Sequence, residues 1–299
     1  MNITGVAWHG YVLPFRCGYV TSDCRSPVRH GLLVFLQADS GLIGIGDASP
    51  VGPADKIRVG EFAAALTELG PQFLGMDVAG FDVNALSTPS ELRFGLETAL
   101  LDLEGRTRGL SVAELLGGTP CSFPVNALIA CDDTRSAASE ALEAVRQGFT
   151  SFKIKVGRGT LDEDEALVSA VRQAIGPEMK LRLDPNQAWG VAQAIESIRR
   201  LSRYDLQYVE QPVAANDISG LARVRHGVPV PIAADEALGT RSDLSRILDA
   251  EASDLFIVKA ARLGGLRTAL DVARLAHEAG KPVVITSSLE CGVGIAAGT

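Results

Sequence analysis

The sequence predicts a (β/α) barrel preceded by a smaller α+β domain. From residue 125 onward, short apolar runs alternate with helical patterns, which is typical of a parallel sheet with crossover helices. Charged residues end five of these runs at intervals of roughly 25 positions, enough for one strand, one helix and two loops. The first 54 residues are β-rich, and two helical patterns follow them. We therefore expect two domains, a capping domain at residues 1–120 and a barrel at residues 121–299.

The amino-terminal domain is expected to combine strands with two helices. A turn at Ala38–Gly41 separates the apolar segments GLLVFLQ and GLIGIG, as in a β-hairpin. Helical patterns cover about residues 57–74 and 90–108, and Gly109 is expected to end the second helix.

The barrel domain is expected to contain seven strands. Strand patterns lie near residues 125–130, 151–156, 180–184, 206–210, 230–235, 254–259 and 282–286, and helical patterns lie near 134–148, 161–175, 190–202, 217–225, 240–249 and 264–279. The last residues, GIAAGT, look like the opening of a seventh helix. We therefore expect the closing strand of the barrel to be missing from this sequence, which would leave two unpaired strand edges.

Charged side chains at the carboxyl ends of barrel strands are expected to meet at one mouth of the barrel. Asp184, Glu210 and Asp235 follow three successive strands, so they provide three carboxylates for one divalent cation. Ligation by oxygen alone favours Mg²⁺ or Mn²⁺ over zinc. Lys155 and Lys259 end strands on either side, so a substrate carboxylate on the metal would lie between them. Each acid taken alone could instead be a turn or helix-cap residue.

Strand parity predicts which neighbouring residues face the mouth. In S-F-K-I-K-V, Lys153 and Lys155 share one face and the apolar residues share the other. Two adjacent ammonium groups disfavour each other's protonation, which lowers a lysine pKa towards that of a useful base. By the same rule Arg182 shares a face with Asp184 and should reach the mouth of the barrel, below or beside the metal. Glu236 follows Asp235 directly, so we expect Asp235 to face the cation and Glu236 to stand behind it.

This arrangement is suited to removing a proton α to a carboxylate. The enediolate that forms is very unstable in water because it carries two negative charges. A divalent cation and an ammonium group can stabilise that charge while a second lysine takes the proton.

Composition and terminal patterns favour a soluble intracellular protein. Counts of 28 basic and 36 acidic residues give a net charge of −8 without a dense basic run, so we expect no nucleic-acid partner. No signal-peptide pattern opens the chain and no apolar run is long enough to span a membrane, so we expect a cytoplasmic protein. The charged residues of the barrel mouth predict that its partner is a small-molecule carboxylate. Five cysteines without a C-x-x-C pair indicate neither a disulfide framework nor a zinc site.

The segments around the charged residues form a set of motifs: K-I-K at 153–155, D-P-N-Q-A-W at 184–189, V-E-Q-P at 209–212, A-D-E at 234–236 and Lys259. Together they resemble the muconate-lactonising branch of the enolase superfamily over nearly the whole chain. The resemblance implies a modified TIM barrel, (β/α)₇β, with an α+β capping domain. It also implies that Lys155 is the base, that Lys259 steadies the enediolate and that the three acids bind Mg²⁺.

Further segments resemble o-succinylbenzoate synthases: P-S-E-L-R-F-G-L-E-T-A-L-L-D at 89–102, P-V-N-A-L-I at 124–129 and S-S-L-E at 287–290. This resemblance implies dehydration of 2-succinyl-6-hydroxy-2,4-cyclohexadiene-1-carboxylate to o-succinylbenzoate in menaquinone biosynthesis. The residues expected near the substrate are Lys153, Arg182, Asn186, Ser287 and Ser288. The serine pair is suited to hydrogen-bonding a succinyl group.

Two other functions fit the same residues. An N-acylamino acid racemase or a dipeptide epimerase would use both lysines as bases on opposite faces of the substrate, although S-S-L-E favours the dehydratase. An inactive scaffold would follow from loss of the last strand. The segment Arg16–Arg29 is expected to fold over the mouth, where Arg16, Arg25 and Arg29 are candidates for binding a second carboxylate or are solvated charges.

Overall fold

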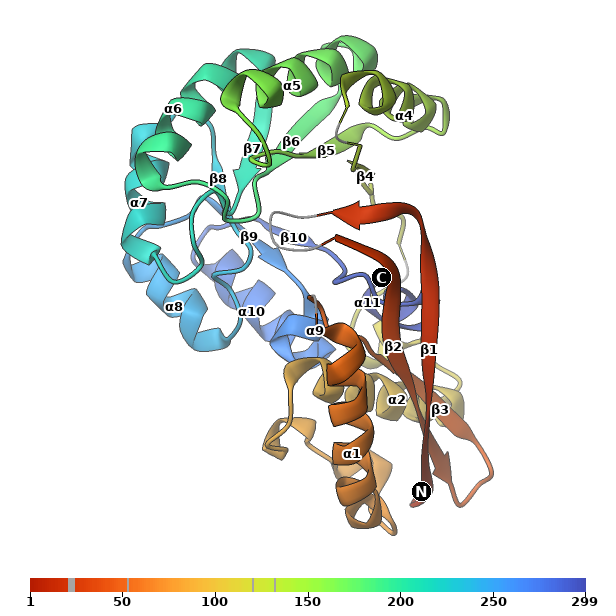
Figure 1. Cartoon of the computed structure of the whole chain (residues 1–299). Helices are drawn as coiled ribbons and strands as arrows, with labels where there is room; N and C mark the ends of the chain where they lie inside the picture. Colours follow the sequence, from red (N-terminus) through yellow and green to blue (C-terminus); the bar gives the residue numbers. More distant parts are fainter. Residues whose placement is uncertain (21–24, 53, 120, 132) are drawn as a thin grey trace.

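A computed structural model describes residues 1–20, 25–52, 54–119, 121–131 and 133–299, and the side chains of residues 16–25 lie outside this description. Arg16 and Arg25, which the sequence offered as carboxylate-binding candidates, therefore lie outside it. The structure consists of an antiparallel amino-terminal sheet with its own helices and a curled parallel sheet with helices around it (Figure 1). The predicted fold class, a capped (β/α) barrel, is confirmed.

The amino-terminal domain is a three-stranded antiparallel sheet with the order β1-β2-β3, covered by helix α2. Its elements are β1 (Ile3–Val20), β2 (Arg25–Ala38), β3 (Ile43–Ala48), α1 (Asp55–Phe73), the 3₁₀ turns η1 (Val78–Gly80) and η2 (Val83–Ala85), α2 (Ser90–Arg108) and α3 (Val112–Leu115). A Cβ atom at Gly46 of β3 would collide with the Gly95 carbonyl oxygen of α2. Glycine is therefore needed where this helix crosses the strand. Gly109 ends α2 in the left-handed conformation at φ 67°, as the sequence predicts.

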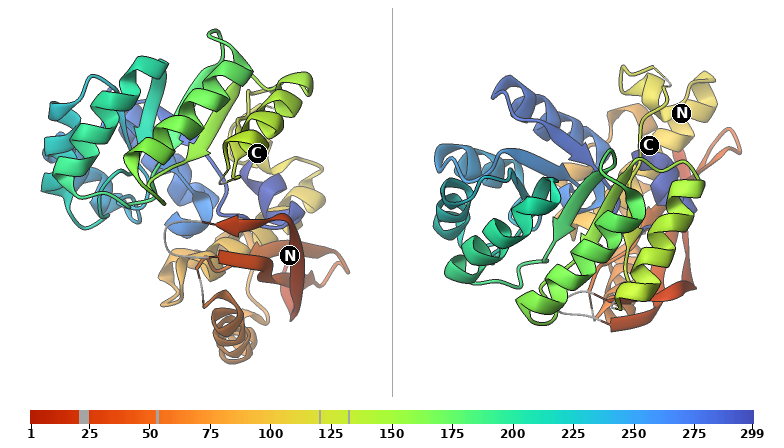
Figure 2. Two further views of the ribbon diagram at one scale, coloured as in Figure 1. Left: turned by 45° about the horizontal axis from the view of Figure 1, so that its top comes forward. Right: turned by 90° about the horizontal axis from the view of Figure 1, so that it is seen from above.

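Seven parallel strands form the curled sheet, in the order β10-β9-β8-β7-β6-β5-β4. They are β4 (Ala127–Ile129), β5 (Ser151–Lys155), β6 (Lys180–Asp184), β7 (Leu206–Glu210), β8 (Ile232–Ala234), β9 (Leu255–Val258) and β10 (Val283–Ile285). The helices between the strands are α4 (Thr134–Arg146), α5 (Leu161–Ile175), α6 (Val191–Leu201), η3 (Ser202–Tyr204), α7 (Ile218–Gly227), α8 (Arg241–Asp249), α9 (Ala260–Leu263) and α10 (Leu266–Glu278). Helix α11 (Gly292–Gly298) follows β10. The larger helices lie outside the sheet (Figure 2).

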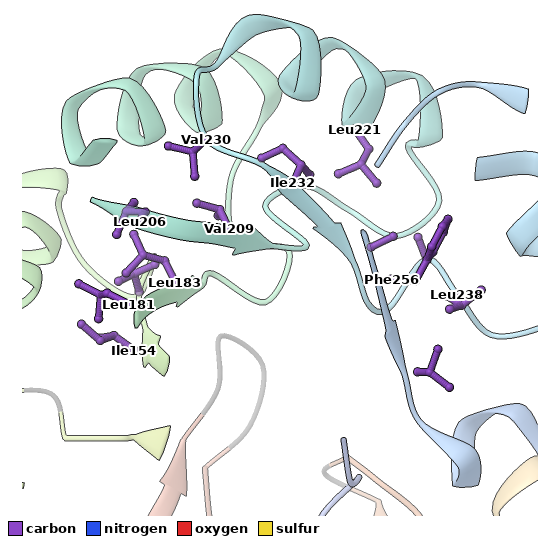
Figure 3. Close-up of a cluster of buried hydrophobic side chains, with 14 of the residues drawn as sticks. Ile154, Leu181, Leu183, Leu206, Val209, Leu221, Val230, Ile232, Leu238 and Phe256 are labelled. Carbon is purple, nitrogen blue, oxygen red and sulfur yellow. The ribbon is translucent and has the colours of Figure 1, made fainter. Parts of the chain in front are cut away.

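The main core lies between the strands and the surrounding helices. Ile154, Leu183 and Val209 point outward from three neighbouring strands, and Leu221 of α7 lies in the same buried cluster (Figure 3). Because side chains alternate along a strand, this burial turns the residues between them towards the inside of the barrel. The apolar packing thus sets which face carries the charged groups.

The one-turn helix α9 is a feature that the sequence pattern did not predict. Its four residues are too few to show a helical period, and only Lys259 separates them from β9. No helix within the described ranges is long and apolar enough to cross a membrane. Cys121 and Cys291 are free thiols, Cys131 Sγ donates to Glu140 Oε2 at 3.2 Å, and the side chains of Cys17 and Cys24 are not described.

Candidate active site

A pocket of about 460 Å³ opens at the carboxyl ends of the barrel strands, beside the amino-terminal domain. The barrel contributes Asn126, Leu128, Lys153, Lys155, Asn186, Gln187, Glu236, Lys259, Arg262, Thr286, Ser287, Ser288 and Leu289 to its lining. The amino-terminal domain contributes Phe15, Ser26, Val28, Arg29, Val51, Gly52 and Asp55. Both domains therefore shape the space in which a substrate would bind.

The two lysines of β5 lie on one face of the strand and share the buried carboxylate of Asp184. Lys155 Nζ donates to Asp184 Oδ2 at 2.6 Å and to Asn186 Oδ1 at 2.5 Å. Lys153 Nζ lies 2.8 Å from Asp184 Oδ2 and donates to Glu210 Oε1 at 2.6 Å. The β5–β6 register pairs Lys155 with Asp184 directly, so this contact follows from the strand pairing.

A second lysine–carboxylate pair lies across the barrel. Lys259 follows β9 and lines the pocket, and its Nζ donates to Asp235 Oδ2 at 2.5 Å. Arg262, one helical turn later, places Nη1 3.8 Å from Asp235 Oδ1. The pocket therefore has an ammonium group on each side, Lys155 on β5 and Lys259 after β9, each held by a buried aspartate.

Burial and neighbouring charges shift the pKa values of these groups in different directions. Burial lowers the pKa of Lys155, and the nearby Lys153 charge lowers it further, although Asp184 opposes both. Burial disfavours the Lys153 charge as well, but Asp184 and Glu210 together raise its pKa. Burial and the Asp184 charge raise the pKa of Glu210 to about 8. Lys155 is thus the lysine of this pair whose neutral, basic form is favoured.

The three acids at the strand ends have the chemistry of a divalent-cation site. Asp184, Glu210 and Asp235 are each 1% exposed, and the buried Asp235 Oδ1 has no hydrogen-bond partner. In the part of the chain that is described, no three acidic, histidine or cysteine groups already converge on one point. Lys153 Nζ bridges two of the carboxylates instead. The donor set fits Mg²⁺, because Mg²⁺ prefers oxygen ligands, and these three carboxylates are the groups that would hold it.

Two polar residues next to the proposed metal ligands, Asn186 and Gln211, form hydrogen bonds to Glu236 and to the Asp235 backbone. Asn186 has a positive φ of 45°, and its amide Nδ2 donates to Glu236 Oε1 at 3.1 Å. Gln211 Oε1 accepts the Asp235 and Ala237 backbone N–H groups, both at 3.0 Å. Glu236 lines the pocket wall while Asp235 lies beneath it. Burial and the Asp235 charge raise the pKa of Glu236.

Arg182 is not among the residues that line the pocket, and of the two positions that the sequence predicts for it, below or beside the metal, the structure places it in the lower one. Its guanidinium donates to Gln207 Oε1 and Asn126 Oδ1, both at 2.9 Å, and lies 5.1 Å from the centre of the Tyr208 ring. Parity put it correctly on the same face as Asp184. However, two residues along a strand amount to about 6.6 Å, so Arg182 lies deeper in the barrel.

Arg29 joins the amino-terminal domain to the pocket wall formed by Ser287, Ser288 and Leu289. It is only 5% exposed, and it donates to the Leu289 carbonyl at 3.0 Å, the Ser288 carbonyl at 3.3 Å and the Ser49 carbonyl at 2.8 Å. Leu289 has a positive φ of 65°. These bonds hold the wall in a conformation that leucine rarely adopts. Arg29 is therefore neither a solvated charge nor a free carboxylate ligand.

Arg29→Met is expected to lower the free energy of unfolding by about 3 kcal/mol, because it breaks a buried hydrogen-bond network and leaves Asp55 without its guanidinium 3.8 Å away. Urea denaturation at equilibrium measures this change. Arg108→Met is the matched control, since Arg108 is an exposed residue of α2 whose loss should cost less than about 0.5 kcal/mol. Equal losses for the two variants would contradict the role given to Arg29.

Sequence reasoning missed the pocket residues Arg262, Asp55 and Val51. Arg262 lies three positions after Lys259, so its place beside the lysine was recoverable once α9 was known to be helical. Asp55 and Val51 come from the other domain, and no local pattern indicates which of its loops faces the barrel.

Comparisons with known proteins agree with this geometry. A model of the enolase C-terminal domain-like family matches residues 136–299, and a model of the mandelate racemase / muconate lactonizing enzyme N-terminal domain matches residues 24–117. N-succinyl-L-Arg/Lys racemase of Bacillus cereus is 29% identical over 311 aligned positions, which cover 100% of this chain and 83% of that protein. The o-succinylbenzoate synthase of Thermobifida fusca is 46% identical over 179 residues, 59% of this chain and 54% of that protein.

A solved structure shares the same architecture. The dipeptide epimerase of Cytophaga hutchinsonii, solved with Mg and the dipeptide D-Ala-L-Val, superposes with a TM-score of 0.92 at 27% identity. The match covers 100% of this chain and 83% of that one. Lyases, racemases and epimerases thus all resemble this chain.

Proposed function

The chain belongs to the mandelate racemase / muconate lactonizing enzyme family of the enolase superfamily, and from this premise we propose that it removes the proton α to a substrate carboxylate. One observation carries the proposal. Lys155 and Lys259 flank a single pocket, and each is held by a buried carboxylate. An α-carbon between them would face an amine on each side.

The surroundings of the lysines suit them to different roles, proton removal for Lys155 and charge stabilisation for Lys259 and Lys153. The neutral Lys155 amine takes the α-proton, and the electron pair of the broken C–H bond moves into the carboxylate to give an enediolate. Lys259 and Lys153 remain charged and stabilise the negative charge on that group. A divalent cation held by Asp184, Glu210 and Asp235 would supply further positive charge at the carboxylate.

Dehydration of 2-succinyl-6-hydroxy-2,4-cyclohexadiene-1-carboxylate to o-succinylbenzoate is the first candidate reaction. After proton removal, the Lys155 ammonium returns its proton to the departing hydroxyl, so water leaves and the ring becomes aromatic. The 46% identity to the Thermobifida fusca synthase and the Ser287–Ser288 wall of the pocket support this candidate.

Racemisation of an N-acylamino acid is the second candidate, supported by the match of the whole chain to the Bacillus cereus racemase. Here one lysine removes the α-proton and the opposite lysine delivers a proton to the other face. The placement of a lysine on each side of the pocket suits this reaction as well.

Two assays with added Mg²⁺ test these candidates. Absorbance of the aromatic product measures dehydration, and polarimetry on N-succinylamino acids measures racemisation. We expect turnover in at least one assay. A protein that binds Mg²⁺ yet is inactive in both, and exchanges no α-proton with solvent deuterium, would contradict the proposed function.

Arginine substitutions separate the two candidates. Arginine stays charged but cannot act as a base near neutral pH. In the dehydratase, Lys259 needs only its charge, so Lys259→Arg should keep a trace of activity that Lys155→Arg loses. In the racemase both lysines transfer protons, so both variants should lose racemisation. Equal tolerance of arginine at both positions would contradict the assigned roles.

A further inference from the structure

Glu97 lies at the contact between the amino-terminal domain and the segment that carries Lys259. It belongs to α2, and it is 3% exposed. Its Oε2 accepts the backbone N–H of Leu266 and, at 3.4 Å, that of Arg267. These are the first two residues of α10, whose N–H groups have no partner within the helix. A carboxylate from the other domain therefore caps this barrel helix.

The turn before α10 is shaped to receive α2. A Cβ atom at Gly265 would collide with the Glu97 carboxylate, and one at Gly264 would lie 2.8 Å from Arg93 Nη2. Gly264 also has φ 87°, where side chains other than glycine are strained. The two glycines therefore lie against one face of α2, which carries Arg93 and Glu97 four positions apart.

Backbone hydrogen bonds connect this anchored turn to Lys259. The Gly265 N–H donates to the Ala260 carbonyl at 3.0 Å, and the Leu263 N–H donates to the Lys259 carbonyl at 3.1 Å. Helix α9 lies between them and packs against α2. The Lys259 backbone is therefore connected through the single turn of α9 to Leu266, where Glu97 binds the start of α10.

A role in packing alone does not explain a carboxylate here. Glu97 is buried, so its charged form is disfavoured and its pKa is raised, although the Leu266 and Arg267 N–H groups oppose the shift. An apolar residue would fill the space without that cost. What a carboxylate adds is directional bonding to two backbone groups, which fixes where the helix begins.

We propose that Glu97 is a positioning residue that sets the reach of Lys259 into the pocket. The inference rests on the proposed function, in which Lys155 and Lys259 face opposite sides of the α-carbon. Loss of Glu97 should then impair the steps of Lys259 and spare those of Lys155. This selectivity distinguishes positioning from a general loss of stability.

The test compares Glu97→Ala with Glu91→Ala. Glu91 is on the same helix and forms an ion pair with Arg58 at 3.0 Å inside the amino-terminal domain, so its loss controls for destabilisation without touching α9 or α10. Exchange of the α-proton with solvent deuterium is followed by NMR for each enantiomer of an N-succinylamino acid. Lys259→Met identifies the enantiomer whose proton faces Lys259.

We expect Glu97→Ala to slow exchange from that enantiomer about 10-fold in kcat and to change exchange from the other enantiomer less than about 2-fold. Glu97→Gln keeps an oxygen acceptor and should recover part of the loss. Glu91→Ala should affect both enantiomers alike. Equal slowing of both enantiomers by Glu97→Ala, or no slowing, would overturn the inference.

A second measurement is independent of catalysis. Amide hydrogen exchange of the peptide spanning residues 259–267 should be at least about 10-fold faster in Glu97→Ala than in the unmodified protein, and unchanged in Glu91→Ala. If the unmodified protein exchanges no α-proton of an N-succinylamino acid, the racemase candidate fails, and this measurement alone decides the role of Glu97. Unchanged amide exchange in Glu97→Ala would overturn the inference whatever the activity.

Discussion

Replacing Lys155 by methionine is expected to lower the rate of α-proton removal by about 10²- to 10⁴-fold, the usual contribution of a positioned general base. Methionine fills a similar volume but has no basic nitrogen. The loss should appear in kcat, because the pocket keeps its other lining residues. Solvent-deuterium incorporation at the α-carbon, followed by NMR, measures the step directly in either candidate reaction.

Lys180→Met is the matched control for this substitution. Lys180 is an exposed lysine at the amino end of β6, the opposite end of the sheet from the pocket. Its loss should leave the exchange rate within about 2-fold and stability within about 0.5 kcal/mol. Comparable exchange by the Lys155→Met variant and the unmodified protein would show that another group removes the proton.

Most of the barrel could be predicted because its pattern is local and repeated. The apolar runs around Ile154, Leu183 and Val209 pack under helices, and that packing fixes the opposite face by strand parity. Regular spacing then brings Lys155 and Asp184 to the same end of the sheet. Such inferences need only the period of the chain and the geometry of a strand.

Depth within the barrel and contacts between domains could not be predicted in the same way. Parity gave the correct face for Arg182 but left open whether it lies below or beside the metal, and it did not indicate that Asn126 and Gln207 bind its guanidinium. Arg29 and Glu97 each contact residues more than 150 positions away in the sequence. Their partners are set by how two domains dock, which no local pattern encodes.

Chelation is expected to abolish activity, and Mg²⁺ or Mn²⁺ should restore it. The expectation rests on three buried carboxylates. Asp184 ends β6, Glu210 ends β7, and Asp235 directly follows β8. The two lysines alone would leave much of the enediolate charge without stabilisation. Assays before and after treatment with EDTA, and after addition of each metal, measure the effect. Full activity of metal-free protein would show that the acids serve another purpose.

Glu210→Gln is expected to weaken Mg²⁺ binding by about 100-fold or more, measured by isothermal titration calorimetry. Replacing a residue that only hydrogen-bonds to a metal ligand already lowers metal affinity by about 10- to 100-fold. Removing the charge of a carboxylate that binds the metal itself should lower the affinity at least as much. Glu278→Gln, an exposed acid in the last turn of α10, is the control and should leave binding unchanged. Glutamine has nearly the same shape as glutamate, so the comparison isolates the charge. Equal affinities in the two variants would remove Glu210 from the metal site and leave it as the partner of Lys153, 2.6 Å away.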